Sequence, residues 1–314
     1  MAKKVLTPEE YKSKMEKKVD KRKRFSKAFF TTLAFALACV IVYSSMVIAY
    51  TPKTAVGASG SSSAATDDGI DSTPVPTVDA AATVATDPVD TEVELSNSSS
   101  AEDVVAYFNS AINLVKPNAK QITLVKEENK QAGSLEGNLP SFIKSMADDL
   151  IADNMGVKDL STLDPGMVNA TTVEQKNAMF PVENESWSSK LEASDIEKFD
   201  VKDDGKNYTI TLNIKGDAPS DATDHGVGHA GRIFSVIKPS IVTENAGPAA
   251  SIIKSVQTGH KDGYVTVTID KTTGNVTAAT YYFTWTLVVV VNAGITELNV
   301  SIPFGLQKDF TISW

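Results

Sequence analysis

The hydrophobic and polar positions divide this chain into three parts with different patterns. Residues 29–50 form an apolar run without a charged residue, FFTTLAFALACVIVYSSMVIAY. Residues 51–98 show no hydrophobic period, whereas residues 99–314 switch between helical and strand-like periods. The pattern therefore predicts an apolar helix, a spacer and one folded α+β domain.

The apolar run has the length of a membrane span. A helix over residues 29–50, at about 1.5 Å per residue, crosses a hydrocarbon core of roughly 30 Å. The alternative is a cleaved signal peptide, for which Val56-Gly57-Ala58 is a possible cleavage site. We favour a retained transmembrane anchor, because the apolar core of a signal peptide has only about 7–15 residues.

Charge fixes the expected orientation of this anchor. Residues 1–28 carry eleven Lys or Arg and four Asp or Glu, which leaves 19 basic and 35 acidic residues in the rest of the chain. Positive charge beside a span stays in the cytoplasm. We therefore expect a single-pass cell-membrane protein with a basic cytoplasmic tail and an extracytoplasmic C-terminal domain. The tail is either a topology signal alone or also a contact to anionic lipid of the inner leaflet.

The composition of the exported part narrows its partners and its compartment. Its acidic balance argues against a nucleic-acid partner, because phosphate binding needs clustered Lys and Arg. The single cysteine, Cys39, lies inside the apolar run, so we expect no disulfide outside the membrane. A disulfide-free surface protein is typical of a bacterial cell envelope rather than an animal secretory route. Residues 51–98 contain Lys53 and eight acidic residues among Ser, Thr, Ala and Pro, which predicts a disordered linker.

Helical spacing predicts three helices in the folded domain and one further helix or helical turn. Ser100 caps the first, and Pro117 ends it. Its apolar face consists of Val104, Tyr107, Phe108, Ala111, Ile112 and Val115. Pro140 opens a second helix, with an apolar face of Phe142, Ile143, Met146, Ala147, Leu150 and Ile151. A shorter helix is expected over Val173–Phe180, and Gly231–Ile237 is expected to begin a further helix or a helical turn, limited by Pro239.

Period-two alternation predicts the strands. Before the last third, they are Gln121–Lys126, Trp187–Leu191, Ile196–Lys202 and Tyr208–Ile214, with a hairpin turn at Asp203–Lys206. The last third predicts an antiparallel meander of Ser251–Thr258, Tyr264–Asp270, Val276–Val291, Ile295–Phe304 and Leu306–Trp314, with a turn at Lys261–Gly263. The strand Val276–Val291 would exceed about 50 Å at roughly 3.3 Å per residue, so it must bend, bulge or break. We therefore expect helices packed on a curved antiparallel sheet.

Candidate chemistry is sparse. Asp224, His225 and His229 could bind zinc, but two glycines between the histidines disfavour the helix that would bring them together. Carboxylates such as Glu183, Glu185, Asp195 and Glu197 are numerous, but the sequence does not pair them. Aromatic residues on the long strand and at the C-terminus could instead line an apolar cavity for a lipid or another small ligand: Tyr281, Phe283, Trp285 and Trp314. The alternative for this aromatic set is an ordinary core behind the helices.

These features favour a non-enzymatic, membrane-anchored extracytoplasmic protein that binds a ligand or a partner in a bacterial cell envelope. The order of anchor, acidic linker and helix-first α+β domain resembles surface proteins and lipoproteins of Gram-positive bacteria, an analogy that transfers no function. Two alternatives remain: a lipid-binding module, and a metal-dependent hydrolase that uses Asp224, His225 and His229. We expect no cofactor.

Overall fold

The structure is a computed structural model that describes the folded domain. It describes residues 94–314, except 139–140, 142–143, 146–147, 149–154, 245 and 293–296. The predicted tail (1–28), the predicted span (29–50) and nearly all of the predicted linker (51–98) lie outside the described residues, as does the apolar face of the helix expected after Pro140. Within the described ranges, no helix has both the length and the apolar character to span a bilayer.

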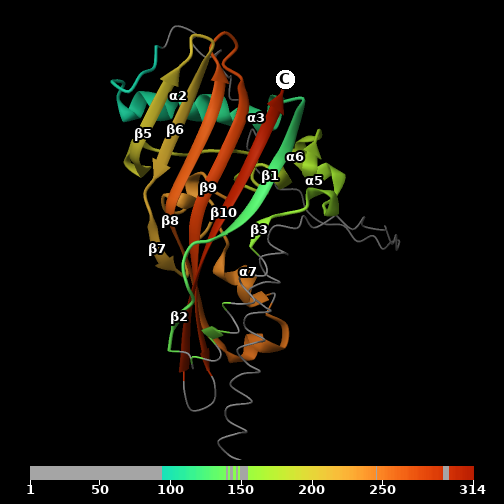
Figure 1. Ribbon diagram of the computed structural model, residues 1–314, viewed down its shortest axis with the longest axis vertical. Helices are drawn as coiled ribbons and strands as arrows, with labels where there is room; N and C mark the ends of the chain where they lie inside the picture. The colour runs from blue at the N-terminus through green and yellow to red at the C-terminus, as the bar shows by residue number, and fades with distance from the viewer. Residues whose placement is uncertain are drawn as a thin grey trace, which may run out of the picture.

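A single antiparallel sheet organises this domain (Figure 1). In the described part of the chain it has ten strands, with the main order β3-β1-β10-β9-β8-β6-β5. The principal strands are β1 (Gln121–Gln131), β5 (Ile196–Asp203), β6 (Asn207–Ile214), β8 (Ile253–Asp270), β9 (Val276–Asn292) and β10 (Glu297–Ser313). Short strands at its margins are β2 (Glu136–Gly137), β3 (Gly156–Val157), β4 (Asn169–Ala170) and β7 (Asp217–Ser220). The predicted α+β class and antiparallel sheet are confirmed.

The C-terminal meander has fewer and longer strands than predicted. Lys261–Gly263 is a bulge inside β8 rather than a turn, because the pairing with β9 shifts register between Lys261 and Tyr264 and then continues. Asp262 adopts a φ of 53° at this bulge. The predicted strands on either side of Gly305 are likewise one strand, β10, which pairs with β9 without a register shift. The bulge lets β8 follow the curvature of the long strands.

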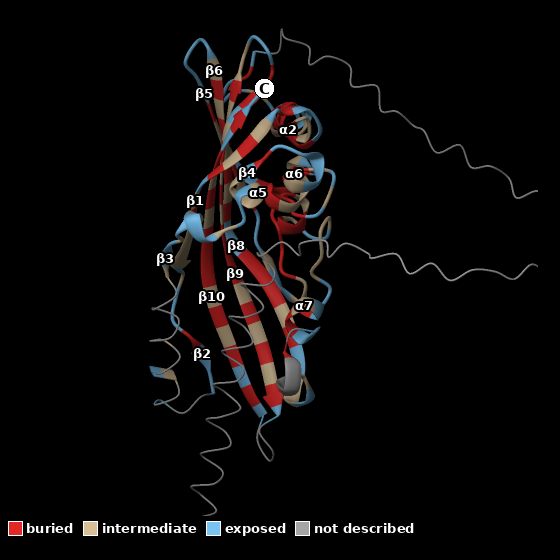
Figure 2. Ribbon diagram, turned by 90° about the vertical axis from the view of Figure 1, so that its right-hand side faces the viewer, coloured by how far each residue is buried: buried red, intermediate tan, exposed pale blue. Residues whose placement is uncertain are grey.

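The helices lie together on one side of the sheet. Figure 2 shows α2 (Ala101–Asn113), α5 (Pro165–Val168), α6 (Val173–Met179) and α7 (Pro239–Glu244) on the same side of the long strands. The short α3 (Val115–Asn118) follows α2. The described connections also contain 3₁₀ turns: η1 (Leu160–Thr162), η2 (Ala193–Asp195), η3 (Ala230–Arg232) and η4 (Gly247–Ile252). The helix α2 begins as predicted, because the Ser100 side chain accepts a hydrogen bond from the Asp103 N–H.

One predicted strand is wrong, and one predicted helix or turn is a turn. Trp187–Leu191 is not a strand, because side chains of α2 and α3 bind the main-chain groups that a neighbouring strand would otherwise pair. Of the helix or helical turn expected to begin at Gly231, the structure has the turn: the three-residue 3₁₀ turn η3. Pro239 begins the helix α7 instead of ending a helix before it, which agrees with the preference for proline at the first helical position.

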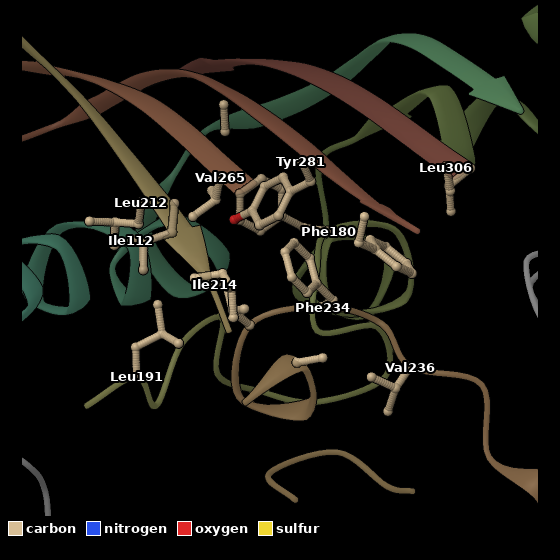
Figure 3. Packing of buried hydrophobic residues seen from close by; sticks show 14 of the residues in the cluster. Ile112, Phe180, Leu191, Leu212, Ile214, Phe234, Val236, Val265, Tyr281 and Leu306 are labelled. Atoms are coloured by element: carbon tan, nitrogen blue, oxygen red, sulfur yellow. The ribbon is translucent and has the colours of Figure 1, made fainter. Parts of the chain in front are cut away.

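The core fills the space between the helical side and the inner face of the sheet (Figure 3). Alternate residues of β9 point inward and are buried, as the sequence pattern predicts. Tyr281 makes edge-on contacts with Phe180, Phe234 and Phe310, at ring-centroid distances of 5.7, 6.4 and 6.1 Å. Phe180 and Phe234 lie on the connections that cross this face, so these rings fix both connections against the sheet.

Candidate ligand-binding cleft

A buried lysine holds the connection that forms one wall of the candidate site. Lys116, in α3, has no exposed surface. Its Nζ donates hydrogen bonds to the main-chain carbonyl oxygens of Val182 (2.7 Å), Glu185 (2.8 Å) and Trp187 (3.0 Å). Three acceptors match the three N–H groups of a charged ammonium. Burial lowers the pKa of Lys116 to about 7, while the nearby carboxylates of Glu183 and Glu185 oppose this shift.

Asparagines of α2 hold the next residues of the same connection. The Asn113 carboxamide accepts from the N–H groups of Ser188 and Ser189 and donates to the Ser189 carbonyl oxygen. The Asn109 side chain donates to the Leu191 carbonyl oxygen at 2.8 Å. Residues 182–191 are therefore irregular but fixed, because helix side chains satisfy their main-chain groups.

A chain of ionic groups connects this wall to the sheet; Glu127, Glu183 and Lys308 are buried, and Lys158 at its end is partly exposed. The Nζ of Lys308 lies 2.6 Å from Glu183 Oε1 and 3.8 Å from Glu127 Oε2, and Lys158 in turn contacts Glu127 at 3.1 Å. Burial alone would lower the pKa of Lys308, but the two carboxylates raise it above its ordinary value. Lys308 is thus a buried cation that neutralises Glu183 at the edge of the site.

The candidate site is a cleft of about 170 Å³. Residues 183–185 form one wall, and residues 235–241, which lead into α7, form another. Its complete lining is Glu183, Asn184, Glu185, His225, Ser235, Val236, Ile237, Lys238 and Ile241. The cleft thus combines an apolar wall with acidic, basic and imidazole side chains, the mixture by which small-molecule sites orient a ligand.

Glu185 is the most accessible carboxylate of this lining, with 36% of its side chain exposed. Its Oε2 accepts from the Trp187 indole N–H at 3.1 Å, and its Oε1 lies 3.3 Å from His225 Nδ1. Burial lowers the pKa of His225, although Glu185 opposes this shift, so the imidazole is neutral at pH 7. A carboxylate can only accept, so Nδ1 carries the proton and Nε2 is left as an acceptor.

The structure does not bring Asp224, His225 and His229 together as a metal site. His225 contacts Glu185, His229 Nδ1 lies 2.7 Å from Asp195 Oδ1, and Asp224 pairs with Lys238. Within the described ranges, no group of three or more His, Cys, Asp or Glu side chains is placed to hold a metal ion. His225 and His229 instead attach the loop that carries them to Glu185 and Asp195, which lie on the connection between α6 and β5.

The four aromatic residues expected to line an apolar cavity lie in different surroundings. Tyr281 and Phe283 border a void of about 10 Å³, which is the space of about one water molecule. Trp285 stacks on Phe304 with a centroid distance of 5.0 Å. Trp314 is 37% exposed, and its indole N–H donates to the Val276 carbonyl oxygen at 2.8 Å.

Sequence reasoning named Glu183 and Glu185 but missed Lys116, Lys238 and Lys308. Two of these lysines interrupt apolar patterns. Lys116 continues the series Val104, Phe108 and Ile112 at a spacing of four, and Lys308 falls between Leu306 and Phe310 on the inner face of β10. A charge at a core position is the signal that could have identified them. Comparison with protein-family models, with curated proteins and with solved structures finds no match for this chain.

Proposed function

We propose that the protein is a membrane-anchored, extracytoplasmic protein of a bacterial cell envelope, and that its folded domain binds a small ligand without chemical conversion. The observation that carries this proposal is the cleft of about 170 Å³, with charged and apolar side chains on fixed walls. Buried Lys116 and Lys308 hold one wall in place. Such preorganisation reduces the ordering that binding would otherwise require.

Binding is favoured over metal-dependent hydrolysis by the separation of Asp224, His225 and His229, which contact three different partners. Binding of a long-chain lipid behind the aromatic strand has less support, because the void beside Tyr281 and Phe283 admits about one water molecule. The polar cleft on the helical side is the better candidate.

The location of the domain is proposed from the sequence. The uncharged run at residues 29–50 and the basic residues before it support a single span with the domain outside the cytoplasm. Protease treatment of intact cells tests this topology. We expect cleavage within residues 51–314 and protection of residues 1–28. Cleavage of the basic tail with a protected C-terminal domain would contradict the proposal.

Ligand binding can be followed through Trp187, whose indole contacts Glu185 at the cleft. Full-length protein in detergent micelles is titrated with a panel of small amines, amino acids, carboxylates and sugars. We expect one of these ligand classes to change the tryptophan fluorescence until the change saturates. The response should disappear in Trp187→Phe but persist in Trp314→Phe, because the Trp187 indole donates to Glu185 of the cleft, whereas the Trp314 indole donates to the Val276 carbonyl oxygen, outside the lining. Absence of saturable binding by every class, measured also by calorimetry, would contradict the proposed function.

A further inference from the structure

We infer that the ligand of the cleft is a small organic cation: an alkylammonium group on a short apolar body. This inference rests on the proposed binding function and specifies the ligand class for the same cleft. It follows from the charges, the hydrogen-bonding groups and the size of the cleft.

The charges of the lining leave one carboxylate without a cationic side-chain partner. Glu183 is paired with buried Lys308, and Lys238 is paired with Asp224. Glu185, by contrast, contacts the Trp187 indole and the His225 imidazole, and it forms no ion pair with a Lys or Arg of the described residues. Lys116 bonds to the main chain of Glu185, but the three hydrogen bonds of its Nζ go to carbonyl oxygens rather than to a carboxylate. Glu185 is thus the accessible anion for which a ligand could supply the cation.

The hydrogen-bonding groups beside Glu185 also favour a donor ligand. The Glu185 carboxylate is an acceptor, and the neutral His225 ring, with its proton on Nδ1, has an acceptor at Nε2. An ammonium group carries three donors and no acceptor, so it matches this set, whereas a carboxylate ligand would meet like charge at Glu185. An anion could be attracted by Lys238 only in competition with Asp224, which already holds that side chain.

The size and the remaining wall of the cleft limit the body of the ligand. Val236 and Ile237 are buried, and Ile241 is partly buried beside them. A cavity of about 150 Å³ in another protein accommodates benzene. A cleft of about 170 Å³ therefore suits a body of similar size, such as a butyl group with its ammonium.

The test compares three ligands with the same butyl group: n-butylammonium, n-butanol and pentanoate. Each is titrated into full-length protein in detergent micelles by calorimetry, at constant ionic strength. We expect n-butylammonium to bind with at least a tenfold higher affinity than either other ligand, because it alone forms a charge-assisted hydrogen bond with Glu185.

Two variants and a control identify the residue responsible. Glu185→Gln should lower n-butylammonium affinity about tenfold or more. The matched control Glu197→Gln, an exposed carboxylate on β5, should leave it unchanged. Lys238→Gln should raise the affinity severalfold, because it removes a cation and frees Asp224; this result remains informative if Glu185→Gln fails to fold.

The outcomes separate the inference from the function on which it rests. Preferred binding of pentanoate or butanol, or equal affinity in wild type and a folded Glu185→Gln, would overturn the cation inference and leave a ligand-binding cleft. Failure of all three ligands would overturn the cation inference. If the wider panel followed through Trp187 also fails, the proposed function is overturned with it.

Discussion

Lys308 Nζ and Glu183 Oε1 lie 2.6 Å apart, and each side chain is less than a tenth exposed. Lys308 comes from the last strand, whereas Glu183 comes from the connection that forms one wall of the cleft. Taking these two charges out of water is unfavourable, and their mutual attraction together with Glu127 offsets it. The pair therefore holds the cleft wall that carries Glu183 in a fixed position against the strand that carries Lys308.

Replacement of one member of this pair should be strongly destabilising. Lys308→Met leaves Glu183 and Glu127 buried without their shared cation, so we expect a loss of about 3–5 kcal/mol in the free energy of unfolding. Urea denaturation of full-length protein in micelles, followed by near-UV circular dichroism, measures this loss. The matched control is Lys254→Met, which removes an exposed pair with Glu297 and should cost less than about 1 kcal/mol. A double variant, Lys308→Met with Glu183→Gln, should be more stable than Lys308→Met alone; equal or lower stability would contradict the pairing.

Because of Lys116, the free energy of unfolding should increase as the pH rises above 7. Its folded pKa is about 7 against an ordinary value of 10.5, so between these values the unfolded chain binds more protons than the folded one. Stability increases with pH wherever this holds, by about 2 kcal/mol between pH 7 and pH 9 for this group. In Lys116→Met that contribution is absent, so the difference in unfolding free energy between wild type and variant should grow over this range. A difference that is constant or shrinks from pH 7 to pH 9 would contradict the assigned pKa.

The sequence predicted the sheet well because strand alternation is a local property. Tyr281, Phe283 and Trp285 do share the buried face of β9. It did not predict the bulge at Asp262, because a short polar sequence with glycine suits a turn and a bulge equally, and only pairing with β9 decides between them.

The candidate site was less predictable, because its contacts join residues far apart in the chain. Glu183 and Lys308 are separated by 125 positions, and Lys116 reaches a connection 66 or more residues away. The 182–191 connection has no period of its own, since side chains of α2 and α3 determine its path. Periodicity identifies which residues are buried, but it does not identify which polar partners meet there.

Tyr281→Phe should stabilise the domain. The Tyr281 hydroxyl is buried and has no hydrogen-bond partner among the described residues, and burial raises its pKa far above the ordinary value. Figure 3 shows this oxygen on the side of Val265, within the apolar packing of the core. An unsatisfied buried hydroxyl costs about 1–3 kcal/mol, so its removal should raise the free energy of unfolding by about 1 kcal/mol while the ring contacts with Phe180 and Phe310 remain. Thermal and urea denaturation measure this change, and a loss of stability of similar size would reveal a partner for the hydroxyl.

His260 should make the domain sensitive to mild acid. Its ring is buried on the inner face of β8, neither ring nitrogen has a hydrogen-bond partner among the described residues, and burial lowers its pKa to about 4 despite the charge of Asp217. In the unfolded chain the ordinary value of 6.5 applies, so the unfolded state binds the proton first as the pH falls. This contribution to stability is fully present above pH 6.5 and is lost towards pH 4, by about 2–3 kcal/mol at pH 4.5. In His260→Leu the unfolding free energy should therefore fall less between pH 7 and pH 4.5 than in wild type. The comparison of unfolding free energy against pH in the two proteins isolates this histidine from the carboxylates that titrate in both. Equal dependence on pH in wild type and variant would mean that the buried imidazole accepts a proton as readily as a free one.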